Sequence, residues 1–346
     1  MHQCWKMDTP EQKEALLTHA QDIAHQAIRQ YDIPLTDIRF NQISDTITFI
    51  VETEVNQRFL LRIYSNLRKK SDIFFELQFL AHLKEHNLAV PAGQQNSLGD
   101  YVLEYPSPEY GVLHVTLMDW IEGKVLDSPP TTTQVMNTGR LLARLHLAGT
   151  SFQPNDNIIS HRWDVENFRQ NMNKLAQYYE CFLSENEWDF YQDTADKIIT
   201  ELKLIPKDSL HYGVIHGDFH MENVVFRGED AFPIDFGRCG YGYYANDIAG
   251  VMVGLGWQNR KIFMDGYLEQ QSFVQPLNRK TIHATSQVQS SKLLETMFVM
   301  IMIENYCHHC SNHDEIDGLI AEQPHAQAYM RAYLEGRSFL FEKIEL

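Results

Sequence analysis

A polar loop in the second half of the chain carries the side chains best suited to chemistry. It reads HGDFHMEN over residues 216–223, and Asp218 lies five residues before Asn223. Two short apolar segments follow, separated by Gly-Glu-Asp, and this pattern predicts a β-hairpin over residues 224–234. Because a hairpin returns the chain to the end where it began, we expect Asn223 and Asp235 to lie close together.

These residue types suit metal-assisted chemistry on a phosphate. A carboxylate and an amide oxygen are hard ligands for Mg²⁺ that also holds substrate phosphates, so we predict Asn223 and Asp235 as its ligands. Asp218 is not needed as a ligand, and its predicted role is to accept or orient the proton of an attacking hydroxyl. His220 is the second catalytic candidate, with loop support and contact with the phosphoryl or acceptor group both open. We expect His216 to pack under the metal loop rather than to transfer protons.

The order and spacing of these residues resemble the catalytic signature of the protein-kinase fold. His-x-Asp-x-x-x-x-Asn is followed, twelve residues after the Asn, by Asp-Phe-Gly at 235–237, and Asp-Ile-Ala follows at 247–249. Eukaryotic protein kinases normally carry Arg where this chain has Gly217. The chain therefore resembles the aminoglycoside phosphotransferase and choline kinase-like small-molecule kinases, over nearly all residues from about 15 onward.

The resemblance implies an α+β, two-lobed protein-kinase-like fold, with a small β-rich N-lobe, a larger mainly helical C-lobe and the active site between them. It implies an enzyme that moves the γ-phosphoryl group of ATP, with GTP as an alternative, to a hydroxyl of a small molecule. Expected acceptors include aminoglycosides, amino-alcohols, homoserine-like compounds and sugars. A protein Ser/Thr kinase of the same fold and a nucleotide-binding pseudokinase with little transfer activity remain alternatives.

The hydrophobic pattern divides the chain into two parts. The first part predicts helices over 11–31 and 72–86 and strands over 38–43, 46–54, 58–64, 101–105 and 112–118. The second part predicts helices over 132–147, 165–183, 187–204, 279–307 and 326–342. We expect an N-lobe over 1–118 with the nucleotide clamp, a hinge over 119–123, and a C-lobe over 124–346 with the catalytic loop, the metal-binding hairpin and the acceptor site.

One buried charge in the N-lobe predicts a phosphate contact. Arg62 interrupts the apolar strand Phe-Leu-Leu-Arg-Ile-Tyr, and a charge there is costly unless it is paired. Glu76 shares a helical face with Leu80 and Leu83 on the following helix, so it is the expected partner. Under the resemblance, Arg62 binds the α and β phosphates in place of the more usual Lys, and Glu76 holds it.

Other nucleotide contacts are expected at one turn of the N-lobe and at the hinge. The turn at 41–46 contains no glycine, so backbone N–H groups and the hydroxyls of Ser44 or Thr46 are the candidates to bind phosphates. At the hinge, backbone groups are expected to bond the purine edge along the segment that contains Met118, Trp120 and Ile121, with the first two side chains as apolar walls.

The acceptor site is expected among the helices after residue 125. Its candidate lining residues are Trp163, Asp164, Glu166 and Tyr243. We expect Asp247 to cap the N-terminus of a helix over 248–255. The segment Cys-His-His-Cys at 307–310, with His313, is a weak candidate for zinc, because it ends a long helix and no second Cys pair accompanies it.

Composition limits the partners of the chain. Lys and Arg total 29 against 46 Asp and Glu, and the resulting net charge of −17 disfavours nucleic-acid binding. The most apolar stretch, 297–303, is far shorter than the ~20 residues of a membrane span, so no membrane partner is expected. The five cysteines read as reduced thiols, and the N-terminus lacks a secretory pattern. We therefore expect a cytoplasmic protein, either monomer or homodimer.

Overall fold

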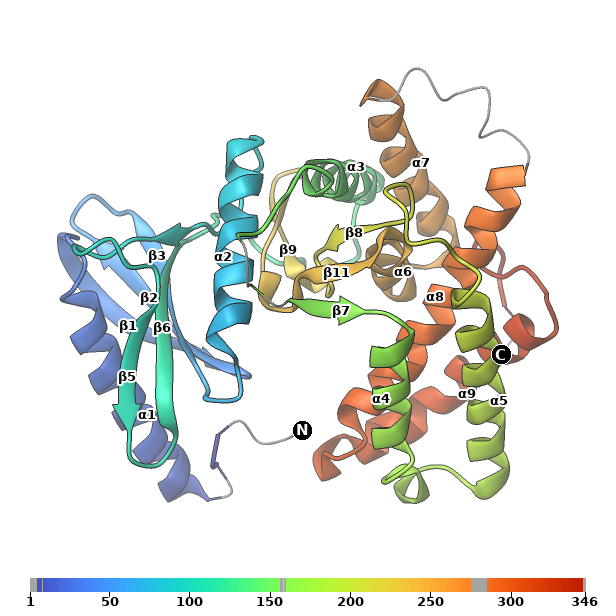
Figure 1. Cartoon of the computed structure of the whole chain (residues 1–346), viewed down its shortest axis with the longest axis horizontal. Coiled ribbons are helices and arrows are strands. Elements are labelled where there is room, and N and C mark those ends of the chain that lie inside the picture. Colours follow the sequence, from blue (N-terminus) through green and yellow to red (C-terminus); the bar gives the residue numbers. More distant parts are fainter. Residues whose placement is uncertain (1–4, 8, 156–157, 159, 275–284, 345–346) are drawn as a thin grey trace. The chain divides into compact units, whose positions relative to one another are not determined.

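The computed structural model describes residues 5–7, 9–155, 158, 160–274 and 285–344, which form two compact units (Figure 1). The N-terminal unit ends at Glu122 and also includes the segment Gln153–Ser160. The C-terminal unit comprises Gly123–Phe152 and the chain from His161 onward.

The N-terminal unit contains two helices and one antiparallel sheet. Its elements are α1 (Pro10–Ile28), β1 (Leu35–Ile43), β2 (Thr46–Thr53), β3 (Arg58–Tyr64), α2 (Lys70–Glu85), β4 (Gly93–Gln94), β5 (Leu103–Ser107) and β6 (Gly111–Asp119). The strand order is β1-β2-β3-β6-β4, and β5 pairs with β6. The predicted helices and strands are therefore present, and β4 is an additional short strand that the sequence pattern does not reveal.

Alternation along the strands builds the core of this unit. Leu61 and Ile63 of β3 are fully buried in one cluster with the apolar face of α1. A capping box between Thr9 and Gln12, with Pro10 in the first turn, fixes the start of that helix. Because successive side chains of a strand point to opposite faces, Arg62 points away from this core.

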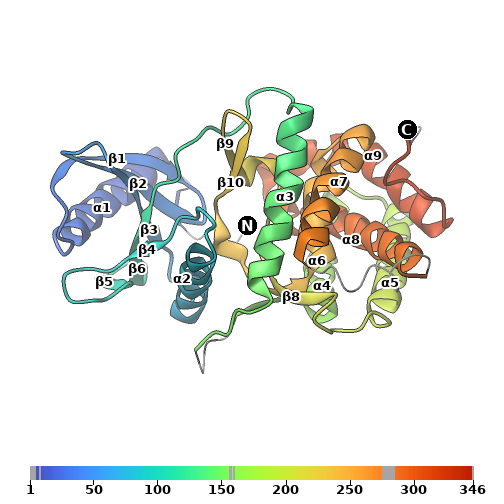
Figure 2. The ribbon, with the colours of Figure 1, turned by 90° about the horizontal axis from the view of Figure 1, so that it is seen from above.

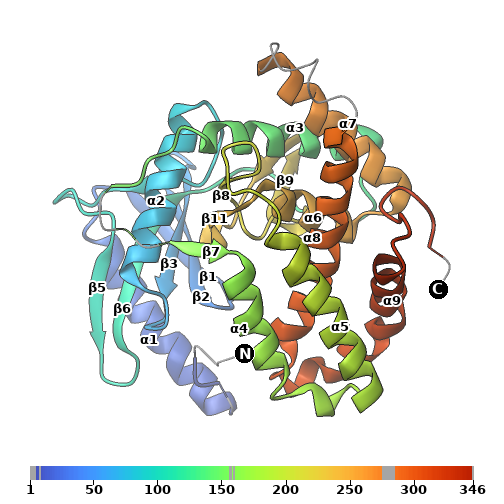
Figure 3. The same cartoon turned by 45° about the vertical axis from the view of Figure 1, so that its right-hand side comes forward.

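The C-terminal unit is mainly helical. Its helices are α3 (Thr132–Gly149), α4 (Val165–Leu175), α5 (Glu185–Leu202), α6 (Tyr244–Gly254), α7 (Trp257–Val274), α8 (Thr285–His309) and α9 (Ile316–Leu334). Helix α3 runs alongside α7 (Figure 2), and α4 packs against α8 (Figure 3). Among the described residues, no helix is both long and apolar enough to cross a membrane.

Five short strands lie among these helices. They are β7 (His161–Trp163), β8 (Tyr212–Ile215), β9 (Val224–Arg227), β10 (Asp230–Pro233) and β11 (Gly240–Tyr243). Strands β9 and β10 form the predicted hairpin, and β11 lies between β7 and β8 in a separate three-stranded sheet. The loop between β8 and β9 carries Asp218, His220 and Asn223, and the loop between β10 and β11 carries Asp235.

Three predicted helices have different bounds. The helix predicted over 165–183 ends at Leu175 and is followed by a short 3-10 helix at Tyr179–Cys181. The helix predicted over 326–342 runs from Ile316 to Leu334, straight through Pro324. The first residues of the helix predicted over 279–307 lie outside the described residues, and its described part is α8.

Candidate active site

The β9–β10 hairpin brings two predicted metal ligands to one end. Its register pairs Val224 with Pro233. Beyond the last pair, the backbone N–H of Ile234 donates to the carbonyl of Asn223 over 2.9 Å. Asn223 and Asp235 therefore flank the same end of the hairpin, as the sequence predicts.

Asn223 ties the catalytic loop to this end. Its Nδ2 donates to the carbonyl oxygen of Asp218 over 2.8 Å and to Nε2 of His220 over 3.0 Å. Both amide hydrogens are then used, so the carboxamide oxygen is the atom that remains for a cation. The second bond makes Nε2 of His220 an acceptor, which places the proton of this imidazole on Nδ1.

Asp235 and Asp218 present their carboxylates to solvent. Asp235 adopts a left-handed conformation with φ 59° and ψ 66°, which non-glycine residues rarely adopt, and its Oδ1 accepts from the N–H of Gly237 over 3.4 Å. The Asp218 side chain is 34% exposed, and its Oδ1 lies 3.6 Å from Nη1 of Arg238. Asn223 thus links the predicted site residues: its side chain bonds to Asp218 and His220, and its backbone carbonyl bonds to the residue before Asp235.

The catalytic loop is supported from beneath by Asp247. This carboxylate is fully buried and accepts from the backbone N–H groups of His216, over 2.7 Å, and Gly217, over 2.8 Å. It also lies 3.1 Å from Nε2 of His146 on α3. The prediction that Asp247 caps its helix is wrong: α6 already begins at Tyr244, so the carboxylate lies inside the first turn and binds the loop instead.

Two further residues fix the loop conformation. His216 is fully buried, its Nε2 donates to the carbonyl of Ile234 over 2.9 Å, and its ring packs on Phe236. This favours the structural role expected for it. Gly217 has φ 79°, and a Cβ there would overlap both the carbonyl oxygen of Arg238 and the indole nitrogen of Trp163. Only glycine fits at this turn without strain.

In the N-terminal unit, Arg62 and Glu76 form a buried ion pair. Nη1 of Arg62 lies 2.5 Å from Oε1 of Glu76, whose side chain is fully buried. A second guanidinium, Arg68, lies 3.4 Å from the other oxygen. Sequence reasoning missed Arg68, which sits in a polar stretch where no pattern sets it apart. The structure brings the predicted pair together, and its role toward a nucleotide stays a prediction.

The other predicted nucleotide contacts lie at the β1–β2 turn, in β6 and directly after it. At the β1–β2 turn, the N–H of Ser44 donates to the carbonyl of Thr46 over 2.9 Å. Met118 lies inside β6 and is fully buried. Trp120, just beyond that strand, stacks under the guanidinium of Arg58, and Ile121 is half-buried. Their contacts with a nucleotide stay predictions.

Comparison with known proteins assigns the chain to a family. A family model described as "Phosphotransferase enzyme family" matches residues 38–277. The chain belongs to this family. It is a small-molecule kinase, an ATP-dependent phosphotransferase to hydroxyl acceptors, as predicted.

Individual relatives agree with the assignment. Amicoumacin kinase of Bacillus subtilis is 25% identical over 243 residues, which cover 69% of each protein. The solved amicoumacin kinase hAmiN, in complex with AMP-PNP, Ca²⁺ and Ami, superposes with a TM-score of 0.72 at 15% identity and covers 91% of this chain and 93% of its own. A microcompartment-associated aminopropanol kinase gives 0.72 at 18% identity, over 92% of this chain and 99% of its own. The predicted protein-kinase-like fold is confirmed.

In this phosphotransferase, two of the four predicted acceptor residues hold the fold together. The carboxylate of Asp164 caps α4 and lies 3.0 Å from Nζ of Lys207. Burial opposes ionisation of Asp164, but Lys207 and the cap amides outweigh it and lower the pKa. The hydroxyl of Tyr243 donates to the carbonyl of Leu202 from a buried position.

The other two candidates differ in where they lie. Glu166 is exposed on the first turn of α4, beside Arg169. Trp163 lies against Arg238, and its Nε1 donates to the carbonyl of that residue over 3.0 Å. Sequence reasoning missed Arg238, although it directly follows the Asp-Phe-Gly motif.

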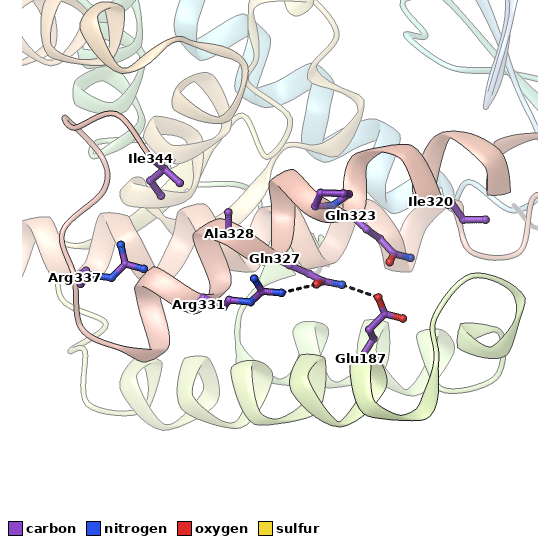
Figure 4. Close-up of a pocket in the computed structure, with 9 residues that line it drawn as sticks. Glu187, Ile320, Gln323, Gln327, Ala328, Arg331, Arg337 and Ile344 are labelled. Carbon is purple, nitrogen blue, oxygen red and sulfur yellow. Dashed lines mark hydrogen bonds between the residues drawn. The ribbon is translucent and has the colours of Figure 1, made fainter. Parts of the chain in front are cut away.

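The predicted zinc candidate at Cys307 and Cys310 and a surface pocket lie outside the catalytic loop. Within the part of the chain that the structure describes, no group of three His, Cys, Asp or Glu side chains is arranged to hold a metal ion, and Cys307 and Cys310 are buried. A pocket of about 350 Å³ lies between α5 and α9 (Figure 4). There Gln327 links Arg331 to Glu187, so its charged groups are already paired.

Proposed function

We propose that this phosphotransferase moves the γ-phosphoryl group of ATP to a small-molecule hydroxyl with Asp218 as the catalytic base. The acceptor oxygen forms a bond to the γ phosphorus while the bond from that phosphorus to the β–γ bridging oxygen breaks. ADP leaves with the electron pair of the broken bond, and the hydroxyl proton passes to the Asp218 carboxylate. The observation that supports this role is the hydrogen bond from Asn223 to the Asp218 carbonyl, which sets the base beside the end of the hairpin.

The residues at the hairpin fit Mg²⁺. The carboxamide oxygen of Asn223 and the carboxylate of Asp235 are hard donors, and Mg²⁺ is commonly bound by one or two protein oxygens together with phosphates and water. When bound, the ion neutralises charge on the nucleotide phosphates and on the moving phosphoryl group. His220 acts as a positioning residue in this proposal, because its Nε2 holds the amide of Asn223 in the orientation that presents oxygen to the ion.

Within the N-terminal unit, Arg62 is proposed to bind the α and β phosphates. Its pairing with a fully buried Glu76 holds the guanidinium in one place, as a phosphate clamp requires. Ser44 and Thr46 are proposed as further phosphate contacts. The segment with Met118, Trp120 and Ile121 is proposed to bind the purine through backbone groups. Because backbone groups do not identify the base from the residue types, GTP remains an alternative phosphoryl donor.

The role of Asp218 is tested with the isosteric variant Asp218→Asn. Removing a general base typically costs about 10²- to 10⁴-fold in rate, so we expect kcat to fall by that order while the Kd for Mg·AMP-PNP stays within about threefold. Coupled ADP formation with a panel of hydroxyl compounds measures the first quantity, and titration calorimetry the second. Asp230→Asn, at an exposed position of the same hairpin, is the matched control. Retention of most turnover by Asp218→Asn would refute the proposal.

A further inference from the structure

The β1–β2 turn offers no positive charge for phosphates. Residues 41–46 include no glycine, and their one charged residue is an aspartate. The N–H of Ser44 is already used by the carbonyl of Thr46 over 2.9 Å. The turn therefore offers chiefly neutral hydroxyl groups, whereas hydrogen bonds from a cation to a phosphate are roughly twice as strong as neutral ones. Cations elsewhere in the N-terminal unit are the stronger phosphate ligands.

Arg62 lies on the face of the sheet predicted to bind the nucleotide. The register places Thr48, Arg62 and Thr116 directly opposite one another across β2, β3 and β6, and such residues point to the same face. Thr46 and Met118 each lie two residues along their strands from this row, so they share the face. Nη1 of Arg62 also lies 3.6 Å from Sδ of Met118. Strand β3 thus places a cation between a predicted phosphate contact and a predicted purine wall.

Arg68 joins Arg62 at the same carboxylate. It lies in the loop between β3 and α2, where its N–H donates to the carbonyl of Ser65 over 3.1 Å. Its Nη2 lies 3.4 Å from Oε2 of Glu76, while Nη1 of Arg62 lies 2.5 Å from Oε1. Because both oxygens belong to one carboxylate, the two guanidinium groups flank a single buried charge. The Arg68 side chain is 18% exposed and that of Glu76 is fully buried, so a ligand can reach the arginine and not the carboxylate.

This arrangement concentrates positive charge at the predicted phosphate site. Arg62 and Glu76 balance one another, and Arg68 adds a second positive charge to the pair. Tyr64, whose ring lies 5.0 Å from Cζ of Arg62, is neutral at pH 7 because burial raises its pKa to about 12. The N–H groups of a guanidinium point in several fixed directions, so one arginine can donate to a carboxylate and to a phosphate at once.

We propose that Arg68 is a second phosphate ligand of the donor nucleotide, and that Arg68 and Arg62 bind its α and β phosphates from the two sides of Glu76, an inference that rests on the proposed role of Arg62. Arginine in place of lysine at position 62 then has a reason, because planar guanidinium groups can address the two oxygens of one carboxylate along fixed lines. The second arginine also supplies donors that a glycine-rich loop would supply through its backbone.

Nucleotide binding by Arg68→Gln tests this role. We expect the Kd for Mg·AMP-PNP to rise about tenfold or more, as the loss of a charged hydrogen bond implies, while the Kd for adenosine stays within about twofold. Titration calorimetry measures both constants. Arg29→Gln, which removes an exposed arginine at the end of α1, is the matched control. An unchanged Kd for Mg·AMP-PNP, or an equal rise for adenosine, would overturn the inference.

The double variant Arg62→Gln/Arg68→Gln decides whether Arg68 contacts phosphate itself. If Arg68 only holds Glu76 in place for Arg62, its loss has no further effect once Arg62 is gone. We expect instead that Arg68→Gln raises the Kd for Mg·AMP-PNP by at least about threefold in the Arg62→Gln background as well. Absence of this further rise would assign Arg68 a structural role and end the proposal.

Steady-state kinetics gives a second readout. A contact with the α and β phosphates is made in the ground state and the transition state alike, so Arg68→Gln should raise KM for ATP and leave kcat within about threefold. A fall in kcat at unchanged KM would contradict the assignment, because it would place the arginine on the moving γ-phosphoryl group. Arg68→Lys keeps the charge and should recover part of the affinity. It decides the question if thermal unfolding shows that Arg68→Gln is not folded.

The proposed function and this inference can fail separately. If Arg62→Gln raises the Kd for Mg·AMP-PNP and Arg68→Gln does not, the role of Arg62 stands and this inference fails. If Asp218→Asn retains turnover while Arg68→Gln binds AMP-PNP weakly, the base assignment fails and the phosphate assignment stands on the binding data.

Discussion

At the scale of single residues, the N-terminal unit contains both a buried and an exposed ion pair, and the two should contribute differently to stability. The carboxylate of Glu76 is fully buried and serves two guanidinium groups, Arg62 and Arg68. By contrast, Glu104 and Lys70 of the same unit form an exposed pair at 2.6 Å, with both side chains nearly half exposed. Removing one partner of a buried pair leaves an uncompensated charge, whereas exposed pairs contribute little.

The substitutions Glu76→Gln and Glu104→Gln test this contrast directly. We expect Glu76→Gln to lower the free energy of unfolding by about 3 kcal/mol and to raise the Kd for Mg·AMP-PNP, because Arg62 loses its anchor. We expect Glu104→Gln to cost under about 1 kcal/mol and to leave nucleotide binding unchanged. Urea unfolding and titration calorimetry measure both effects. Equal losses in the two variants would mean that the buried pair has no special role.

At the scale of elements, the catalytic loop depends on helices that contribute no reacting group. Asp247 of α6 binds two consecutive loop amides, and His146 of α3 binds the same carboxylate. On the far side of His146, Nδ1 lies 2.8 Å from the hydroxyl of Tyr267 on α7. The loop backbone is therefore held by three helices through one chain of hydrogen bonds.

Asp247→Asn should weaken catalysis more than nucleotide binding. An amide can replace one carboxylate oxygen as an acceptor, but its NH₂ group faces a backbone N–H, so the loop must shift. A misplacement of about 1 Å can cost about 10²-fold in rate, and we expect a loss of kcat of this order. Steady-state kinetics is the measurement, with the exposed Asp189→Asn of α5 as the charge-matched control. An Asp247→Asn enzyme with wild-type kcat would show that the loop keeps its shape unaided.

At the scale of the whole molecule, Glu201 joins three helices of the C-terminal unit. Its two oxygens lie within 2.6 to 3.2 Å of Tyr333, Thr296, Lys292 and Lys197. Burial alone would raise the pKa of Glu201, but these partners outweigh burial and lower it to about 2. A carboxylate with a lowered folded-state pKa stabilises the fold above its unfolded pKa and loses that contribution as the pH falls.

The contribution of Glu201 to folding stability should therefore be lost between about pH 4.5 and pH 2. We expect the thermal midpoint of the wild type to fall across this window more steeply than that of Glu201→Gln, so that the two curves converge at low pH. Above pH 5 the variant should be the less stable protein. Calorimetry at several pH values gives both curves, and Glu315→Gln, at an exposed position, controls for lost charge. Parallel curves for wild type and Glu201→Gln would contradict the assignment.

Patterns of local sequence predict much of this fold but not its long-range details. Apolar and polar residues alternate clearly in the N-terminal strands, and the Gly-Glu-Asp turn marks the hairpin, so both could be predicted. The sheet of β7, β8 and β11 joins strands of three or four residues from distant segments, and no local period marks them. Helix α9 begins before Pro324 and passes through it, where sequence rules place a boundary.

The candidate site divides in the same way. Asp218, Asn223 and Asp235 lie within eighteen consecutive residues and follow a spaced motif, so the sequence predicts them together. Glu304 accepts a hydrogen bond from Asn171 only because α8 packs against α4, a contact between segments more than a hundred residues apart. A contact of that kind follows from helix packing and has no signal in the local sequence.

The turn at Gly217 has a consequence for how this enzyme can diverge. A side chain at this position meets the indole of Trp163 and the Arg238 carbonyl that the indole holds. A lineage that acquires a larger residue at 217 must therefore also replace the tryptophan and shift the backbone at Arg238. Positions 163 and 217 should therefore change in concert during evolution, because only the side chain at 163 can yield the space.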